Sequence, residues 1–267
     1  MARRLYSDLG AFALLGSLLV GASLLQPDTS LQLVEQAGVL RICVPDSFPP
    51  LVTGVAANPG FDVSVLEEIA KRMKVRLALN VNTTMGRDFN PGNWRVTRAQ
   101  CEVVAGGVLT SRTTKSFLET IDTGIENGWV QIAKSGAAIE PGKPVGVYPG
   151  FSGLDRLTLS TYLREKGLRI VLASSPEALS QGLKTSQYDI AVASSLDSLQ
   201  TANALPGLTS TWLPESLGRF AFGFGLWKGD VTLKRRILST YRQLEQDGFL
   251  DKQRQRYGLR ASGPATF

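Results

Sequence analysis

The chain has no histidine among its 267 residues and only two cysteines. Without an imidazole, neither a Ser-His-Asp nor a Cys-His catalytic group can form, and zinc or haem cannot be held by histidine. Two cysteines are too few for a four-cysteine zinc or iron–sulfur site. We therefore expect no metal and no cofactor.

The chain also lacks a large excess of one sign of charge. The 29 Lys and Arg are scattered among 23 Asp and Glu, which leaves a net charge of +6 without a run of five cations. This pattern argues against a nucleic-acid-binding protein. The modest basic excess would suit an anionic membrane surface or an acidic partner. The length fits one large domain or two small ones.

The N-terminal segment indicates the cellular compartment of the rest of the chain. Arg3 and Arg4 precede a charge-free apolar stretch at residues 9–25, and this order is typical of a secretory signal. The stretch is long for a signal core and short for a membrane span. Residues 1–27 are therefore either a cleaved signal peptide or a retained membrane anchor. In both cases we expect the rest of the chain in the periplasm, with no other membrane contact.

This location makes the two cysteines interpretable. Cys43 lies in "VLRICV" and Cys101 in "QCEVVAGGV", and both short apolar segments are typical of buried strands. An exported protein with an even number of cysteines favours a disulfide, here Cys43–Cys101. The alternative is a pair of buried free thiols.

Two series of alternating strands and helices follow along the chain. Short β-branched runs predict strands, and apolar residues at helical spacing predict the helices between them. Ser152 and Ser175 are candidate N-caps, and Gly167 and Gly248 are candidate helix ends. The order predicts parallel sheets with right-handed crossovers. The main predicted strands are 39–44, 75–81, 145–150, 168–174, 188–194 and 218–227, and the main predicted helices are 61–73, 152–167, 175–187 and 231–248.

Several segments resemble a known family. "GVLRICVPDSFPPL", "GFDVSVLEEIAKRMKVRL", "PVGVYPGFSG", "YDIAVAS" and "GFGLWKGDVTLKRRILSTYRQLEQDGFLDKQRQRYG" occur in this order. They resemble the periplasmic solute-binding proteins of family 3 that receive amino acids for ABC importers. The resemblance covers about residues 37–258. It implies an α/β, two-lobed, type II periplasmic-binding-protein-like fold with a hinge and an interlobe cleft. Lobe one would comprise 37–131 plus 220–267, and lobe two 134–218.

The resemblance also implies ligand-binding residues in lobe one. The family's aromatic after the first strand falls on Phe48, which would cover the apolar part of a ligand. Its backbone donors fall on Gly106, Gly107 and Leu109, followed by Thr110. The family's arginine clamp for a ligand carboxylate falls on Thr114, and Arg112 or Lys115 would have to replace it. Arg87, with Asp88 and Asn90, lies in a loop that departs from the family and either lines the cleft or stabilises its own loop.

In lobe two the resemblance points to Tyr148, Gly150 and Ser152 before a helix N-terminus. The family's aspartate for an α-ammonium falls on Ser194, and Asp197 lies one helical turn later. Because a buried ammonium needs a carboxylate partner, an ordinary α-amino acid is not the expected ligand. The ligand-binding residues that we expect are Phe48, Arg87, Gly107, Thr110, Arg112, Tyr148, Ser152 and Ser194.

Three functions follow from this resemblance. The first is a monomeric, non-enzymatic periplasmic protein that captures a small polar or anionic solute, amino-acid-like or an organic acid, for the membrane subunits of an ABC importer. The second is a periplasmic accessory protein of a quinoprotein, methanol-type dehydrogenase. Such proteins use the same fold, and their cysteines resemble Cys43 and Cys101 in position. The third is a dehydratase-like enzyme, which would need an acid in the cleft that the sequence does not identify.

Overall fold

The computed structural model describes residues 27–86, 88–134, 137, 139–150, 152–205 and 207–259. The predicted signal or anchor and Arg87 therefore lie outside the described residues. Within these ranges, no helix combines the length and the apolar character that crossing a membrane requires.

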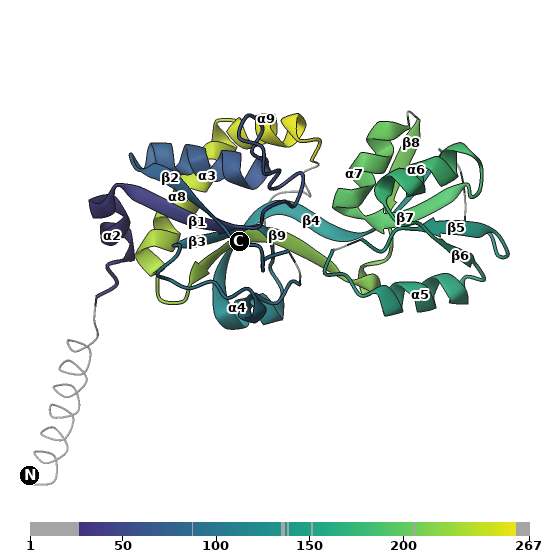
Figure 1. The fold of residues 1–267 in the computed structure, drawn as a ribbon, viewed down its shortest axis with the longest axis horizontal. Helices are drawn as coiled ribbons and strands as arrows, with labels where there is room; N and C mark the ends of the chain where they lie inside the picture. Colours follow the sequence, from purple (N-terminus) through teal and green to yellow (C-terminus); the bar gives the residue numbers. More distant parts are fainter. Residues whose placement is uncertain are drawn as a thin grey trace, which may run out of the picture.

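Two α/β lobes lie side by side, joined by two strands that pass between them (Figure 1). In the first lobe, β1 runs parallel to β2 and β3, so the predicted parallel crossovers are confirmed there. Helices α3, α8 and α9 contact one another on one side of this sheet. The elements of lobe one before the hinge are α2 (Ser30–Ala37), β1 (Val39–Val44), α3 (Phe61–Arg72), β2 (Arg76–Val81), η1 (Pro91–Asn93), β3 (Val103–Leu109) and α4 (Arg112–Phe117).

The hinge is an antiparallel pair of strands, and local sequence patterns predicted only the second of them, at residues 218–227. Strand β4 (Leu118–Lys134) pairs with β9 (Arg219–Trp227) from Leu118 opposite Trp227 to Gly128 opposite Arg219. From Trp129 onward β4 pairs with β7 of lobe two instead. One continuous strand therefore belongs to both sheets, and the lobes can move only by bending β4 and β9.

Lobe two repeats the α/β plan. Strand β5 lies between β6 and β7, parallel to both, while β8 pairs with β4 on the other side. The elements of lobe two are β5 (Pro144–Val147), α5 (Arg156–Glu165), β6 (Arg169–Leu172), α6 (Pro176–Lys184), β7 (Ile190–Ser194), α7 (Ser195–Ala204), β8 (Leu208–Trp212) and η2 (Glu215–Leu217), and the chain then returns through β9 to α8 (Val231–Gln246) and α9 (Phe249–Arg256) in lobe one.

Each lobe has its own apolar core, although Leu196 of α7 in lobe two packs into the core of lobe one. The larger one is built on β1, α3, β3, β9 and α8, with fully buried Ile42, Leu66 and Phe224. Lobe two is filled from both faces of its sheet, one around Trp129 and Leu163 and the other around Leu179. The two-lobed α/β fold that the resemblance implied is therefore confirmed, whereas the residue limits given for each lobe stay a prediction.

The predicted disulfide is confirmed. Cys43, on β1, is bonded to Cys101, just before β3, with a Cα–Cα distance of 5.6 Å. The bridge lies in a small buried cluster with Met85 and Trp94, and the Trp227 indole N–H donates to the Cys101 carbonyl at 2.7 Å. The alternative of two free thiols is excluded in this structure.

One local prediction is wrong. Helix α5 begins at Arg156, and its N-cap is Asp155, whose carboxylate accepts the Leu157 and Thr158 amides. Ser152, the predicted N-cap, lies three residues before Asp155, and its carbonyl accepts a hydrogen bond from the Asn127 side chain. Ser175 is the N-cap of α6, as predicted.

Candidate functional site

The predicted ligand-binding residues of lobe two gather where β5 and β7 end. Tyr148 and Gly150 follow β5, and Ser194 ends β7 directly before α7. Asp197, in the first turn of α7, turns its carboxylate back onto this spot. Its Oδ2 accepts the Ser194 hydroxyl at 2.7 Å, and a Cβ atom added at Gly150 would lie 2.3 Å from that oxygen. Asp197 thus restores the carboxylate that was missing at position 194.

The local sequence explains this placement. The Ser194 side chain also accepts the Asp197 amide at 3.2 Å, so Ser194 caps α7 while Asp197 returns toward it. The same arrangement would serve simply to start the helix. In addition, it places the Asp197 carboxylate beside the loop after β5, where it could contact a ligand bound against Gly150.

The electrostatics of Asp197 set it apart from the other lobe-two acids. Burial raises its pKa, and the hydrogen bond from Ser194 opposes that rise. Asp197 belongs to no ion pair in the described part of the chain. Burial and the charge of Asp197 together raise the pKa of the neighbouring Tyr148 hydroxyl. A partly desolvated carboxylate that has no ion-pair partner gives a cationic group of a ligand a strong electrostatic attraction.

Lobe one contributes aromatic rings. Phe48 makes an edge-to-face contact with Phe89, and a second one with Phe222 of β9, both with centroids 5.9 Å apart. Phe48 lies flat enough on β3 that a Cβ at Gly107 would come within 3.0 Å of its ring. Phe48 and Gly107 are therefore neighbours, and Phe89 is a further ring beside them that the sequence did not indicate.

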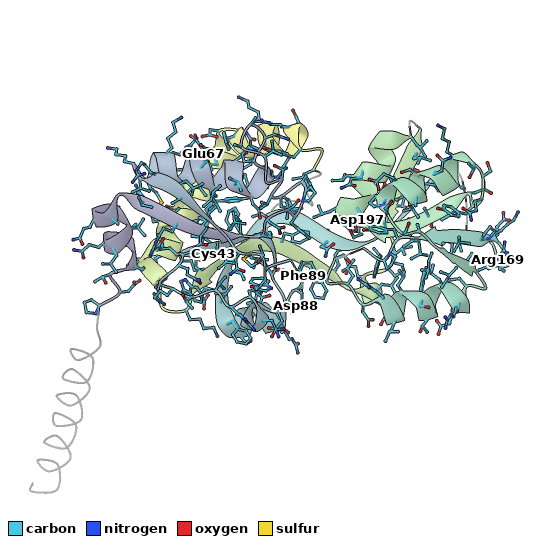
Figure 2. All side chains as sticks on the ribbon, viewed as in Figure 1. Cys43, Glu67, Asp88, Phe89, Arg169 and Asp197 are labelled. Carbon is cyan, nitrogen blue, oxygen red and sulfur yellow. A yellow bond between two sulfur atoms is a disulfide. The ribbon has the colours of Figure 1, made fainter. Side chains whose placement is uncertain are left out.

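Phe89 also reaches lobe two. A Cβ added at Gly153 would lie 2.7 Å from carbons of Phe89 and of Leu109. Figure 2 shows Phe89 on the side of lobe one that faces lobe two, and Asp197 on the opposing side of lobe two. Gly150, next to Asp197, and Gly153, next to Phe89, are three residues apart, which a chain spans in about 11 Å at most. A carboxylate and an aromatic pair thus border one short loop.

The backbone donors expected on β3 are only partly available. The Gly106 amide already donates to Oδ2 of Asp62 at 2.8 Å, inside lobe one. Asp62 is fully buried, and its Oδ1 has no hydrogen-bond partner. Burial raises the pKa of Asp62 to about 7, against the opposing effect of the Gly106 amide. Asp62 therefore shapes the β3 bulge from behind, while Gly107 faces Phe48.

The position at which the resemblance implied an arginine clamp is buried. Thr114 is fully buried, and its hydroxyl lies 3.1 Å from that of Ser111, the N-cap of α4. Arg112 is exposed on the first turn of α4. The hydroxyl of Thr110 donates to the Ala221 carbonyl of the hinge at 3.1 Å. A carboxylate clamp at Arg112 and a contact at Thr110 stay predictions.

The remaining candidates have structural contacts. Ser152 is buried at the hinge, where its carbonyl accepts from the Asn127 side chain at 2.6 Å while its hydroxyl has no partner. Asp88 accepts the Asn90 amide and the Asn93 side chain, each at 2.8 Å, so it stabilises its own loop. Arg87 is outside the described residues. Within the described ranges, no group of three acidic, cysteine or histidine residues is placed to hold a metal ion.

Comparison with known proteins identifies the fold. No protein-family model and no curated protein sequence match the chain. Its structure is similar to a polar amino acid ABC uptake transporter substrate-binding protein from Streptococcus thermophilus, with a TM-score of 0.71 at 16% identity over 89% of this chain and 94% of that one. It is also similar to an ancestral cationic amino acid solute-binding protein, with a TM-score of 0.64 at 18% identity over 85% of this chain and 99% of that one.

An enzyme has this fold too. An ancestral cyclohexadienyl dehydratase gives a TM-score of 0.62 at 19% identity, over 87% of this chain and 97% of that one. The three similarities establish that this chain has the two-lobed fold of solute-binding proteins. Because that fold serves both binding and catalysis, function has to be argued from the residues of the site.

Proposed function

We propose that the chain is a periplasmic solute-binding protein that holds a small polar solute between its two lobes for an ABC importer. The observation that carries the proposal is Asp197, a partly desolvated carboxylate without a cationic partner at the lip of lobe two. In Figure 2 it lies on the side of lobe two that faces Phe89 of lobe one, and Phe89 in turn contacts Phe48. Such a pair of surfaces suits a solute that carries both a cationic and an apolar part.

The polarity of the site favours an amine over a simple organic acid. The position of the family's arginine is the buried Thr114, and the Gly106 amide is already bonded to Asp62. Asp197 would repel an anion and attract an ammonium group. We therefore propose an amine-bearing solute, with its ammonium on Asp197 and its apolar part on the two rings. A carboxylate on that solute would be met by Gly107, Arg112 or Arg87, or by Arg156, whose guanidinium donates to the Gly150 carbonyl.

A thermal-shift panel of amino acids, amines and organic acids tests this proposal. At about 100 times its Kd, a bound solute stabilises the folded state by about 2.7 kcal/mol. An amine-bearing solute should raise the melting temperature of the wild type. Asp197→Asn should weaken its binding by roughly tenfold to a hundredfold, because a charge-assisted hydrogen bond of about 1.5–3 kcal/mol is lost.

Asp189→Asn is the matched control, because Asp189 is an exposed acid of the same lobe. It removes the same charge and should leave binding unchanged. A hit that is equally strong in Asp197→Asn would contradict the assignment of Asp197. A panel in which no amine shifts the melt would contradict the choice of ligand.

The second candidate function is the accessory protein of a quinoprotein dehydrogenase. The Cys43–Cys101 bridge and the loss of the arginine clamp at Thr114 favour it. Isolation of the protein from its own periplasm separates the two functions. Co-purification of a dehydrogenase with no solute response supports the accessory role, whereas co-purification of importer subunits with a solute response supports transport.

A binding role is also proposed over an enzymatic one. The Ser194 hydroxyl donates to Asp197, which suits an ionised carboxylate that accepts hydrogen bonds better than an acid poised to release a proton. Incubation with cyclohexadienyl substrates should give no product. Turnover that is lost in Asp197→Asn would instead identify Asp197 as a catalytic acid.

A further inference from the structure

The basic excess of the chain is confined to its last 49 residues. Residues 219–267 hold ten Lys and Arg against four Asp and Glu. Residues 27–127 hold ten against eleven, and residues 128–218 hold seven of each. The net charge of +6 therefore belongs to α8, α9 and their flanks, and solute binding between the lobes makes no use of it.

Helix α8 turns part of this charge outward. Its buried residues Leu233, Ile237 and Leu244 define the inner face. Opposite to them, at helical spacing, lie Val231, Arg235, Ser239 and Arg242, which we call the α8 ridge. All four are exposed, and so is Arg236 beside them. Neither Arg235 nor Arg236 forms an ion pair with any described residue.

The same helix receives the chain from its apolar N-terminal stretch. Asp28 accepts the Thr232 amide at 2.6 Å and the Ser30 amide at 2.9 Å. Ser30 Oγ lies 3.1 Å from Thr232 Oγ1 and accepts the Leu233 amide at 3.3 Å. Although partial burial raises the pKa of Asp28, the hydrogen bonds from Thr232 and Ser30 outweigh it and hold that pKa well below its usual range. The carboxylate is therefore charged at neutral pH and keeps the two segments joined.

This attachment fixes how far α8 can be from a membrane. The apolar stretch ends at residue 25, and the three residue steps to Asp28 span about 10 Å at most. A stretch retained in the bilayer would therefore hold the first turn of α8 at the bilayer surface. Val231 is 44% exposed there, and Leu33 of the adjoining α2 is 60% exposed.

We propose that the α8 ridge docks on the anionic phospholipid headgroups of the membrane that holds the N-terminal stretch. Each Lys or Arg near such a surface strengthens membrane binding by only about fivefold. Two or three such residues are too few to keep a protein without an anchor on the membrane. The N-terminal stretch supplies the missing part, because it keeps the ridge at a high effective concentration near the headgroups. Lobe one would then lie on the membrane, and lobe two would remain free to move on the hinge.

Site-directed fluorescence on the full chain tests this docking. The two native cysteines are bonded to each other, so Ser239→Cys gives a single labelling site on the ridge. The labelled chain is reconstituted into phosphatidylcholine vesicles with or without phosphatidylglycerol, both carrying a quencher on the headgroups. Leu157→Cys, 80% exposed on α5 of lobe two, is the control site.

We expect strong quenching at position 239 only with phosphatidylglycerol, and reversal of that quenching at about 1 M salt, where the Debye length is about 3 Å. Arg235→Glu with Arg236→Glu should lower the ratio of docked to free ridge by at least roughly thirtyfold. Lys143→Glu with Arg164→Glu, which changes two exposed cations of lobe two, should leave the ratio unchanged.

Three results would overturn the proposal. The full chain could fail to float with either kind of vesicle, which would remove the attachment on which docking depends. Position 239 could be quenched equally with and without phosphatidylglycerol. It could also stay unquenched in both, which would point to an acidic protein as the partner of the ridge.

Discussion

At the scale of single residues, Asp62 is the least expected feature of the molecule. The "GFD" segment places its carboxylate inside lobe one, where one oxygen holds the Gly106 amide at 2.8 Å and the other has no partner. The Asp62 carboxylate forms no ion pair with any residue that the structure describes, and burial raises its pKa to about 7. Asp62 therefore holds the β3 bulge behind Gly107 in place, and its contribution to the free energy of unfolding depends on pH.

Replacing Asp62 with Asn should remove that dependence. The pKa of Asp62 in the folded state is above its ordinary value of 3.8. The stability that wild type has relative to Asp62→Asn is therefore greatest below that value, and it is lost as the pH rises through about 7. Urea unfolding of both proteins across this pH range measures the trend. Asp46→Asn, at an exposed site, should show none, and a parallel pH profile for Asp62→Asn would refute the expectation.

Gly153 is the second residue that the fold constrains. Its φ is +69°, and a Cβ there would meet Phe89 and Leu109 at 2.7 Å. Gly153→Ala should destabilise the chain through backbone strain of about 1–2 kcal/mol and through this clash. Phe89→Ala should relieve only the part of the clash that the Phe89 ring causes, because Leu109 stays in place. A coupling energy of at least about 0.5 kcal/mol in the double-mutant cycle, measured by urea unfolding, would confirm the interlobe contact; strict additivity would disprove it.

At the scale of elements, the Cys43–Cys101 bridge ties β1 to the start of β3. It closes a loop with a sequence separation of 58 residues, which stabilises the folded state by about 4 kcal/mol in the chain-entropy account. Cys43→Ala with Cys101→Ala should lose about that amount in chemical denaturation. Reduced wild type should lose a similar amount, and a loss below about 1 kcal/mol would show that the bridge does not form in solution.

Elements with a strong local pattern were predictable from the sequence. The spacing of apolar residues correctly predicted helix α3, and runs of β-branched residues correctly predicted strands β1, β2, β7 and β9. These signals lie among residues that are neighbours in the sequence. Strand β4 escaped prediction, since polar residues such as Glu119, Thr123 and Asn127 interrupt its apolar pattern. Thr123 and Asn127 are nevertheless buried, and the Thr123 carbonyl accepts the Tyr241 hydroxyl at 2.9 Å. Their partners are distant in sequence, so no local window reveals the strand.

The candidate site shows the same limit. Phe48, Gly107, Tyr148 and Ser194 could be named because a family resemblance aligned the strands that contain or precede them. Phe89 could not, because its place against Phe48 depends on an irregular loop that Asp88 and Asn90 fold by hydrogen bonds. Asp197 lies only three residues from Ser194, but its role depends on a return of the side chain across the first turn of α7.

At the scale of the whole molecule, the proposed function requires the two lobes to close on a solute. Strands β4 and β9 are shared by both halves, while Asp197 and the Phe48–Phe89 pair stand on opposite sides of the hinge. A solute that touches both sides should favour the closed arrangement, because only that arrangement satisfies the carboxylate and the rings together. We therefore expect solute-dependent closure of the lobes to require Asp197.

The most direct measurement is the distance between spin labels on the two lobes. Glu67 of lobe one and Arg169 of lobe two are exposed and lie far apart in Figure 2, and Glu67→Cys with Arg169→Cys provides the labelling sites. Addition of the amine and amino-acid panel should shorten the interlobe distance or narrow its distribution in the wild-type background, and Asp197→Asn should abolish that response. A distance distribution that no solute changes in the wild-type background would contradict the account.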